Sequence, residues 1–274
     1  MRKKNYRLGN LLEPDDRHAV ESSGIDLSGK NRAASFIQQD ERIIASRSLH
    51  KNVEIMSMEQ ALQKIPEART YYGSAFRDIG KQFPEETAGG YFIRVNKGAK
   101  VHVPVQACLY LKSMGFKQQV HNLIIVEEGA ELYLITGCAA SQAARESFHL
   151  GISEFFIHQN SYLNFTMIHS WREDVSVRPM SVARVGAGGN FISNYMNIQP
   201  VRDIVMYPTA VLDGAGSRAS FNSLIYSAAG TRQDIGARVW FREKNTRAEI
   251  ISRAVSSGGE VTARGHLKAE NEQV

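Results

Sequence analysis

A turn signal recurs through the second part of the chain at a nearly constant interval. Each signal is a Gly or Asn followed by a small or polar residue, and successive signals lie 31, 31, 29, 27 and 29 residues apart: Gly98, Gly129, Asn160, Gly189, Gly216 and Asn245. Gly and Asn adopt the positive φ of a tight turn more readily than other residues. A turn that recurs at such an interval is typical of a repeat architecture.

Apolar residues follow each turn signal at fixed positions. The third residue after the signal is apolar in all six cases: Val101, Leu132, Leu163, Ile192, Ala219 and Ala248. The fifth is apolar in five cases, with Asn194 as the exception: Val103, Leu134, Phe165, Phe221 and Ile250. Such alternation directs apolar side chains to one face of a strand, which each coil of a solenoid buries against its neighbours. We therefore predict a mainly β chain with a β-solenoid core; a Greek-key sandwich with evenly spaced hairpins is the alternative.

The residues before this repeat carry helix signals. Ser57 and Gln60 have the spacing of a capping box at the start of a helix. Pro66 is expected to end that helix, and a second helix or helical pair is predicted over residues 67–82.

Two short strands are also expected in this region, at residues 34–37 and 42–45. The change of pattern divides the chain into an N-terminal helical or mixed region, residues 1–89, and a β-solenoid core, residues 90–274.

The charge balance argues against nucleic acid as a partner. The 33 basic and 28 acidic side chains give a net charge of +5, spread thinly along the chain. Binding to a phosphate backbone needs a concentrated basic face, and none is visible. No apolar run approaches the about 20 residues of a membrane helix, and residues 1–6 lack the apolar stretch of a secretory signal after them. We expect a cytoplasmic protein that does not bind membranes.

Two cysteines limit the metal and disulfide chemistry of the chain. They exclude a disulfide-stapled scaffold and cannot alone form a four-cysteine cluster or zinc site. Cys138 stands at a predicted strand end before small residues, where a thiol can accept sulfur or bind a soft metal. The alternative is that Cys138 is a small buried core residue. Cys108 stands in an apolar strand and is assigned to the core.

The eight histidines form neither an HxH pair nor the HExxH zinc signature. His149, His158 and His169 follow Cys138 within 31 residues, so a Cys/His cluster across coils is one interpretation and structural histidines are the other. No metal ligands are assigned.

No nucleophile–base–acid set stands out, which favours a binding or scaffold protein over an enzyme. A β-helix carbohydrate-active enzyme would need carboxylates that converge on one groove. Asp203, Asp213 and Asp234 are the candidates, but nothing in the sequence aligns them.

The chain resembles the SufB/SufD family of iron–sulfur cluster assembly proteins, in particular its small archaeal members. Six segments carry the resemblance in order and spacing: 90–95 (GYFIRV), 123–129 (LIIVEEG), 136–139 (TGCA), 148–149 (FH), 168–171 (IHSW) and 244–253 (KNTRAEIISR). The resemblance implies a right-handed parallel β-helix with helical segments at both ends.

The resemblance also implies a scaffold role. In that role a SufB/SufD-type homodimer or heterodimer works with the ABC-type ATPase SufC, and sulfur and iron become a transient Fe–S cluster on it. ATP hydrolysis then belongs to SufC, so this chain is not expected to be an enzyme. Cys138 matches a family cysteine implicated in receiving or relaying sulfur. A structural β-helix dimer without cluster chemistry is the alternative function.

The chain departs from the family pattern after the repeat. A later family cysteine and the C-terminal helices that contact SufC would fall beyond Val274. We therefore expect that the chain as given does not hold a cluster stably and lacks the SufC contact segment.

Overall fold

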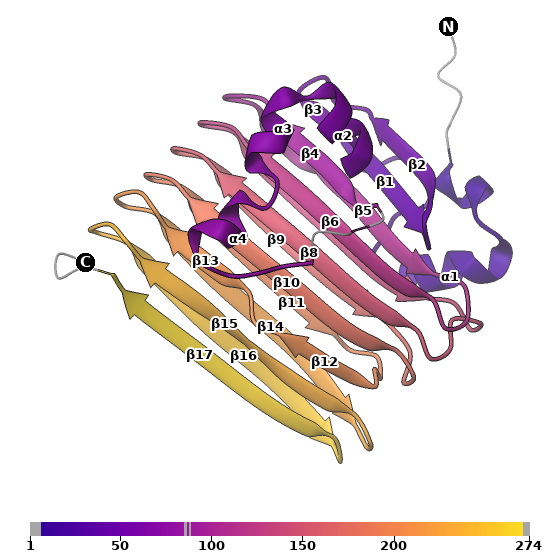
Figure 1. Cartoon of the computed structure of the whole chain (residues 1–274). Coiled ribbons are helices and arrows are strands. Elements are labelled where there is room, and N and C mark those ends of the chain that lie inside the picture. Colours follow the sequence, from indigo (N-terminus) through magenta and orange to yellow (C-terminus); the bar gives the residue numbers. More distant parts are fainter. Residues whose placement is uncertain (1–6, 85–86, 88, 271–274) are drawn as a thin grey trace, which may run out of the picture.

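The computed structural model describes residues 7–84, 87 and 89–270 (Figure 1). Residues 1–6, for which no secretory signal was predicted, lie outside the described part. The protein is mostly β, with a β-solenoid of about six turns and a few helices in its N-terminal part. The predicted β-solenoid is therefore confirmed. The Greek-key alternative is wrong, because the strands of successive coils pair in parallel.

The solenoid consists of two sheets that face each other. From β4 onward, consecutive strands of the chain mostly alternate between the two sheets (Figure 1). The eight-stranded sheet contains β1 (Ala34–Gln39), β2 (Arg42–Ser48), β5 (Lys100–Leu111), β7 (Glu131–Ala140), β9 (Tyr162–Ser170), β11 (Asn190–Asn197), β14 (Arg218–Ala228) and β16 (Arg247–Ser257). The nine-stranded sheet contains β3 (Val53–Ser57), β4 (Tyr91–Val95), β6 (Lys117–Val126), β8 (Phe148–Ile157), β10 (Ser176–Val185), β12 (Asp203–Met206), β13 (Thr209–Leu212), β15 (Arg232–Phe241) and β17 (Glu260–Ala269). We call the space between the sheets, filled by the inward side chains of both, the lumen.

The turn residues stack along one edge of the solenoid. A positive φ between 54° and 73° occurs in each turn: at Gly98, Gly129, Asn160, Gly188, Gly216 and Asn245. In the first five, this residue donates its backbone N–H to a carbonyl in the turn of the next coil, at 2.8 to 3.2 Å. Hydrogen bonds therefore connect the turns of successive coils, in addition to those that connect their strands.

The prediction for the fourth turn is wrong by one residue. Gly188, not Gly189, has the positive φ, and its N–H bonds the Ala215 carbonyl at 2.9 Å. A shift of one residue along a strand moves each side chain to the other face. Phe191 is accordingly buried in the lumen, whereas Ile192 is on the opposite face.

The first strand of the repeat is also irregular. The parallel register between β5 and β7 shifts between Val101 and Val105, and Val105 pairs with Leu134. Val103, which the period placed on the buried face, is 48% exposed. The extra residues in β5 form a local bulge, which the spacing of the turns does not reveal.

The N-terminal part supplies strands as well as helices. The strands expected at 34–37 and 42–45 lie within β1 and β2, and β1 pairs in parallel with β5. Two short N-terminal elements, η1 (Leu8–Leu11) and α1 (Pro14–Ser22), precede them. The division of the chain at residue 89 stays a prediction.

Three short helices cover the outer face of the nine-stranded sheet: α2 (Met58–Lys64), α3 (Pro66–Tyr71) and α4 (Ser74–Asp78). As predicted, the Ser57 hydroxyl caps α2, accepting from the Gln60 N–H at 3.1 Å. None of the helices that the structure describes is long and apolar enough to cross a membrane.

A buried carboxylate attaches α4 to this sheet. Glu154 of β8 is fully buried and accepts hydrogen bonds from the backbone N–H of Gly73 at 2.5 Å and of Ala75 at 2.8 Å. The imidazole of His121, also fully buried, bonds the same carboxylate at 2.8 Å and stacks on Tyr72. Burying a charge is costly unless it is fully hydrogen-bonded, and here three donors surround it.

Candidate functional site

Cys138 lies in the lumen near the end of β7. Its side chain belongs to the core between the sheets and is 2% exposed. In the parallel register its neighbours are Leu109 on β5 and His169 on β9. Burial, with a smaller contribution from Cys108, raises the pKa of the Cys138 thiol well above its usual value. In the resting fold the thiol is therefore protonated.

His169 adjoins Cys138 and is part of a buried polar pair. Its Nδ1 lies 2.9 Å from the hydroxyl of Tyr195. Burial, with a further contribution from His149, lowers the pKa of His169 well below its usual value. Burial raises the pKa of Tyr195, and Cys138 adds to that rise. The pair is therefore a neutral imidazole bonded to a neutral phenol.

A second buried histidine faces the same region from the other sheet. His149 Nδ1 bonds the side-chain oxygen of Gln118 at 2.9 Å, and burial lowers the pKa of His149 to about 3. The ring of Trp171 lies 4.9 Å from that of His149 and 5.4 Å from that of His169. The Trp171 indole N–H is buried and has no partner within the described residues.

Tyr91 and Thr136 complete the surroundings of Cys138. Their hydroxyl groups are 2.9 Å apart. Burial raises the pKa of Tyr91, and Cys138 adds to the rise. We call the group of Tyr91, Thr136, Cys138, His149, His169, Trp171 and Tyr195 the lumen cluster. It combines one thiol with neutral proton donors and acceptors and holds no charge.

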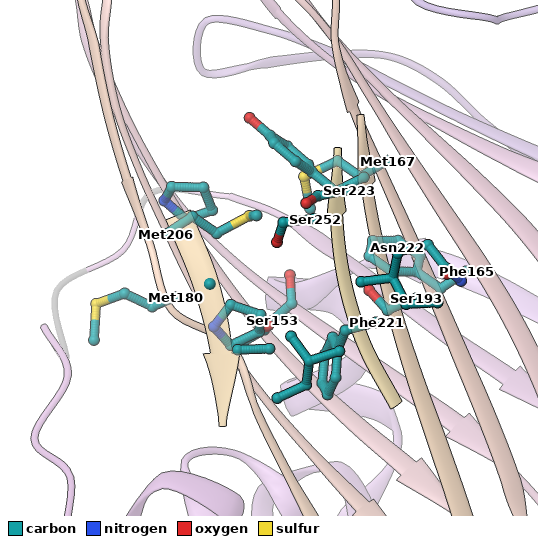
Figure 2. A pocket seen from close by; sticks show the side chains of 18 of the residues that line it. Ser153, Phe165, Met167, Met180, Ser193, Met206, Phe221, Asn222, Ser223 and Ser252 are labelled. Carbon is teal, nitrogen blue, oxygen red and sulfur yellow. The ribbon is translucent and has the colours of Figure 1, made fainter. Parts of the chain in front are cut away.

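A cavity lies farther along the solenoid, in the space between the sheets (Figure 2). Tyr195 lines this cavity together with the thioethers of Met167 and Met206. In Figure 2, Met206 lies on one side of the space, and Met167 and Ser223 lie on the other. The space open to the centres of water-sized molecules is about 40 Å³, and one buried water needs roughly 10–15 Å³. The Ser223 hydroxyl is buried without a partner among the described residues, as expected for a site that holds small polar molecules.

A surface groove lies beside the other end of the cluster. Its lining includes α1, the turns at Ser141 and Arg172, and the residues Ala140 and Trp171. Ala140 is two residues beyond Cys138 on β7, and Trp171 belongs to the lumen cluster. The groove therefore begins two residues from Cys138 along β7, although Cys138 itself does not line it.

The structure brings together only part of the predicted Cys/His group. His149 and His169 join Cys138 in the lumen cluster. His158 does not, because it follows β8 and bonds the Tyr71 hydroxyl at 3.2 Å outside the lumen. Cys108 is buried on the other face of the eight-stranded sheet, among residues of the α1 region, and burial raises its pKa to about 12.

The sequence analysis missed Tyr195, Tyr91 and Gln118. Counting from the turns would not have found Tyr195, because the parallel register pairs it with Met167 and places Asn197 opposite His169. Tyr91 and Gln118 come from the opposite sheet, and no spacing within one strand reveals them.

The structure supports neither a carbohydrate-active site nor a metal centre. Asp203 pairs with Arg178, Asp213 with Arg184 and Arg242, and Asp234 with Arg264, so the three carboxylates are neutralised separately. Among residues 7–84, 87 and 89–270, no group of three or more His, Cys, Asp or Glu side chains could hold a metal ion.

A family model and the curated relatives of the chain all indicate the same protein family. A family model described as "SUF system FeS cluster assembly, SufBD core domain" matches residues 109–272. An iron–sulfur cluster assembly SufBD family protein of Archaeoglobus fulgidus is 41% identical over 94% of this chain and 70% of its own length. A similarly named protein of Methanothermobacter thermautotrophicus is 37% identical over 89% of this chain. One of Staphylococcus aureus is 27% identical over 91%. The chain spans 62% and 56% of the length of the latter two.

Proposed function

Since the chain belongs to the SufB/SufD family of iron–sulfur cluster assembly proteins, we propose that it is a scaffold component on which sulfur and iron form a transient Fe–S cluster. The observation that carries the proposal is the position of Cys138, a single thiol held in the lumen among neutral polar groups. The cluster is cargo, and no described residue set is assigned as its ligands.

In the proposed role Cys138 receives sulfur from a donor persulfide. The Cys138 thiolate attacks the terminal sulfur of the donor, so a new S–S bond forms at Cys138 as the donor's S–S bond breaks. The donor leaves as a thiolate, and no external oxidant or reductant is needed. The Cys138 proton must leave first. The imidazole of His169 is in direct register on the next strand, and it can accept this proton once opening to water relieves the burial that lowers the pKa of His169.

Burial of Cys138 means that sulfur transfer needs an opening step. The raised pKa keeps the thiol unreactive until the region around Ala140 and Trp171 opens to the adjacent groove. We propose that a SufC-type ABC ATPase supplies this opening through ATP hydrolysis, and that this chain hydrolyses no ATP itself. A homodimer or a SufB/SufD-type heterodimer in the cytoplasm is the proposed assembly.

The sulfur step is tested by intact mass after incubation with a persulfide donor, with and without SufC and ATP. The wild-type chain should gain one sulfur atom, more rapidly with SufC and ATP under conditions in which SufC binds it. Cys138→Ser should gain none. Cys108→Ser removes the other buried cysteine and should behave as wild type. Sulfur gain by Cys138→Ser equal to that of wild type would show that Cys138 does not accept it.

The burial of Cys138 also favours a second function, a structural partner without cluster chemistry. Complementation of a strain that lacks the gene separates the two functions. Cys138→Ala should fail to complement if the chain relays sulfur, whereas full complementation supports the structural function.

A further inference from the structure

Trp171 lies between the lumen cluster and the surface groove beside α1. Its side chain is 3% exposed, and the centre of its ring lies 4.9 Å from that of His149 and 5.4 Å from that of His169. The same residue lines the groove, together with its chain neighbours Ser170 and Arg172. Trp171 is the one member of the lumen cluster that borders the groove. Its ring therefore contacts the buried histidines and forms part of the groove wall.

The connection that carries Trp171 contains three buried polar atoms without hydrogen-bond partners among the described residues. This connection, residues 171–175, joins β9 to β10. The three atoms are Nε1 of Trp171, Nε of Arg172 and Oδ1 of Asp174. The last two lie 3.7 Å apart, which is beyond the usual length of a hydrogen bond. A buried polar group without a partner destabilises the conformation that buries it. The buried conformation of this connection therefore leaves polar groups unsatisfied.

The groove offers partners to the Trp171 indole N–H. Asp15 and Ser22 of α1 and Gln142, after β7, line the groove, and each has a side-chain oxygen that can accept a hydrogen bond. Movement of the ring toward the groove would expose the N–H to such acceptors and to water. The hydrogen bond gained in this way would offset part of the free energy that is lost when the apolar ring leaves the core.

We infer that the Trp171 ring is the gate that regulates access to the Cys138 thiol. In the resting fold the ring packs on the two histidines, and in the open state it moves toward the groove. The inference rests on the proposed function, in which Cys138 reacts with a donor from outside the lumen. Ala140 lines the same groove two residues after Cys138, but its methyl group is too small to close this route. Closure therefore depends on Trp171.

The test measures the rate at which iodoacetamide alkylates Cys138, followed by mass spectrometry. The full chain carries Cys108→Ser, so that one thiol remains. The rate is measured at several urea concentrations below the unfolding transition. A local opening exposes little surface and depends weakly on urea, whereas global unfolding depends on it steeply. Trp171→Ala should raise the urea-independent rate at least about tenfold over that of the chain with Trp171.

Two variants separate the gate from a general loss of stability. Trp171→Phe keeps a ring against the histidines and removes the buried N–H, so its rate should stay within about threefold of that with Trp171. Trp240→Ala removes the other tryptophan of the chain, which packs on the outer face of the nine-stranded sheet. It also loses a large ring, yet it should leave the urea-independent rate of Cys138 unchanged.

The gate is refuted if Trp171→Ala and Trp240→Ala show the same urea-independent rate, or if Trp171→Phe reacts as rapidly as Trp171→Ala. Alkylation needs neither a persulfide nor SufC, so these outcomes do not depend on sulfur transfer. A Trp171→Ala chain that is alkylated rapidly but gains no sulfur from a persulfide donor would support the gate and contradict the proposed role of Cys138.

Discussion

Removal of the Glu154 carboxylate should undock the helices from the nine-stranded sheet. The carboxylate accepts three hydrogen bonds, from Gly73 N, Ala75 N and His121 Nε2, at 2.5 to 2.8 Å. Hydrogen bonds to a charged group contribute about 1.5–3 kcal/mol each. The sum over three such bonds is an upper bound on the loss of unfolding free energy. Local opening and rehydration of α4 will make the actual loss smaller. Loss of one member of a buried pair costs about 3–5 kcal/mol, so we expect Glu154→Ala to lower the free energy of unfolding by about 4 kcal/mol.

Urea unfolding followed by tryptophan fluorescence measures this loss. Glu131→Ala is the matched control, because Glu131 is partly exposed and pairs with the exposed Lys100 at 2.7 Å, and its loss should cost about 0–1 kcal/mol. Glu154→Gln keeps the shape of the side chain and one acceptor oxygen, so its loss of unfolding free energy should lie between those of Glu154→Ala and Glu131→Ala. Hydrogen exchange at the amides of Gly73 and Ala75 should accelerate in Glu154→Ala before the strands exchange. Equal stability of Glu154→Ala and Glu131→Ala would refute the reasoning.

Three other predictions concern the turns and the buried titratable groups. Gly98→Ala should lower the free energy of unfolding by about 1–2 kcal/mol because φ is positive there, and Gly98→Asn by less; equal losses in urea melts would contradict this. Cys108 and Cys138 should react with iodoacetamide far more slowly in the folded than in the unfolded chain, as mass spectrometry can follow. The folded state raises the pKa values of both thiols. The two protonated thiols therefore stabilise the fold at pH values below the unfolded pKa of about 8.5, and this stabilisation is lost as the pH rises above that value. The pKa values of His149 and His169 are lowered, to about 3 for His149, so stability should fall as pH drops below about 6.5, by up to about 1.4 kcal/mol per pH unit for each histidine. His149→Gln should flatten that decline, and an unchanged pH profile would contradict it.

The repeat could be predicted because it depends on local chemistry. Gly129 and Asn160 identify their turns by the conformations that these residues adopt, and the apolar residues after them alternate with the strand. The fourth turn, with two consecutive glycines, offers two equally good positions for the positive φ. Only the stacking of Gly188 on the next turn selects one of them.

The sequence allowed single residues of the candidate site to be predicted, but not which of them lie together. Cys138 stands out because free cysteines are few and its strand ends in small residues. The partners of Cys138 depend on which strands face each other across the lumen, and that is a property of the whole solenoid. His149 and His169 were therefore plausible members without a reason to exclude His158, which follows β8 directly and bonds the Tyr71 hydroxyl outside the lumen.

Because the turns and strands stack, the stability of each coil depends mainly on its contacts with the neighbouring coils along the solenoid axis. Along the described part of the solenoid, each coil exchanges strand and turn hydrogen bonds with the coils on either side of it. In such an array, stability is a sum of coil and interface contributions, and unfolding can proceed coil by coil from an end. Hydrogen exchange should therefore reveal a gradient along the axis instead of one global rate. The same independence lets evolution add or remove a whole coil while the hydrogen-bonding pattern of the remaining coils is kept.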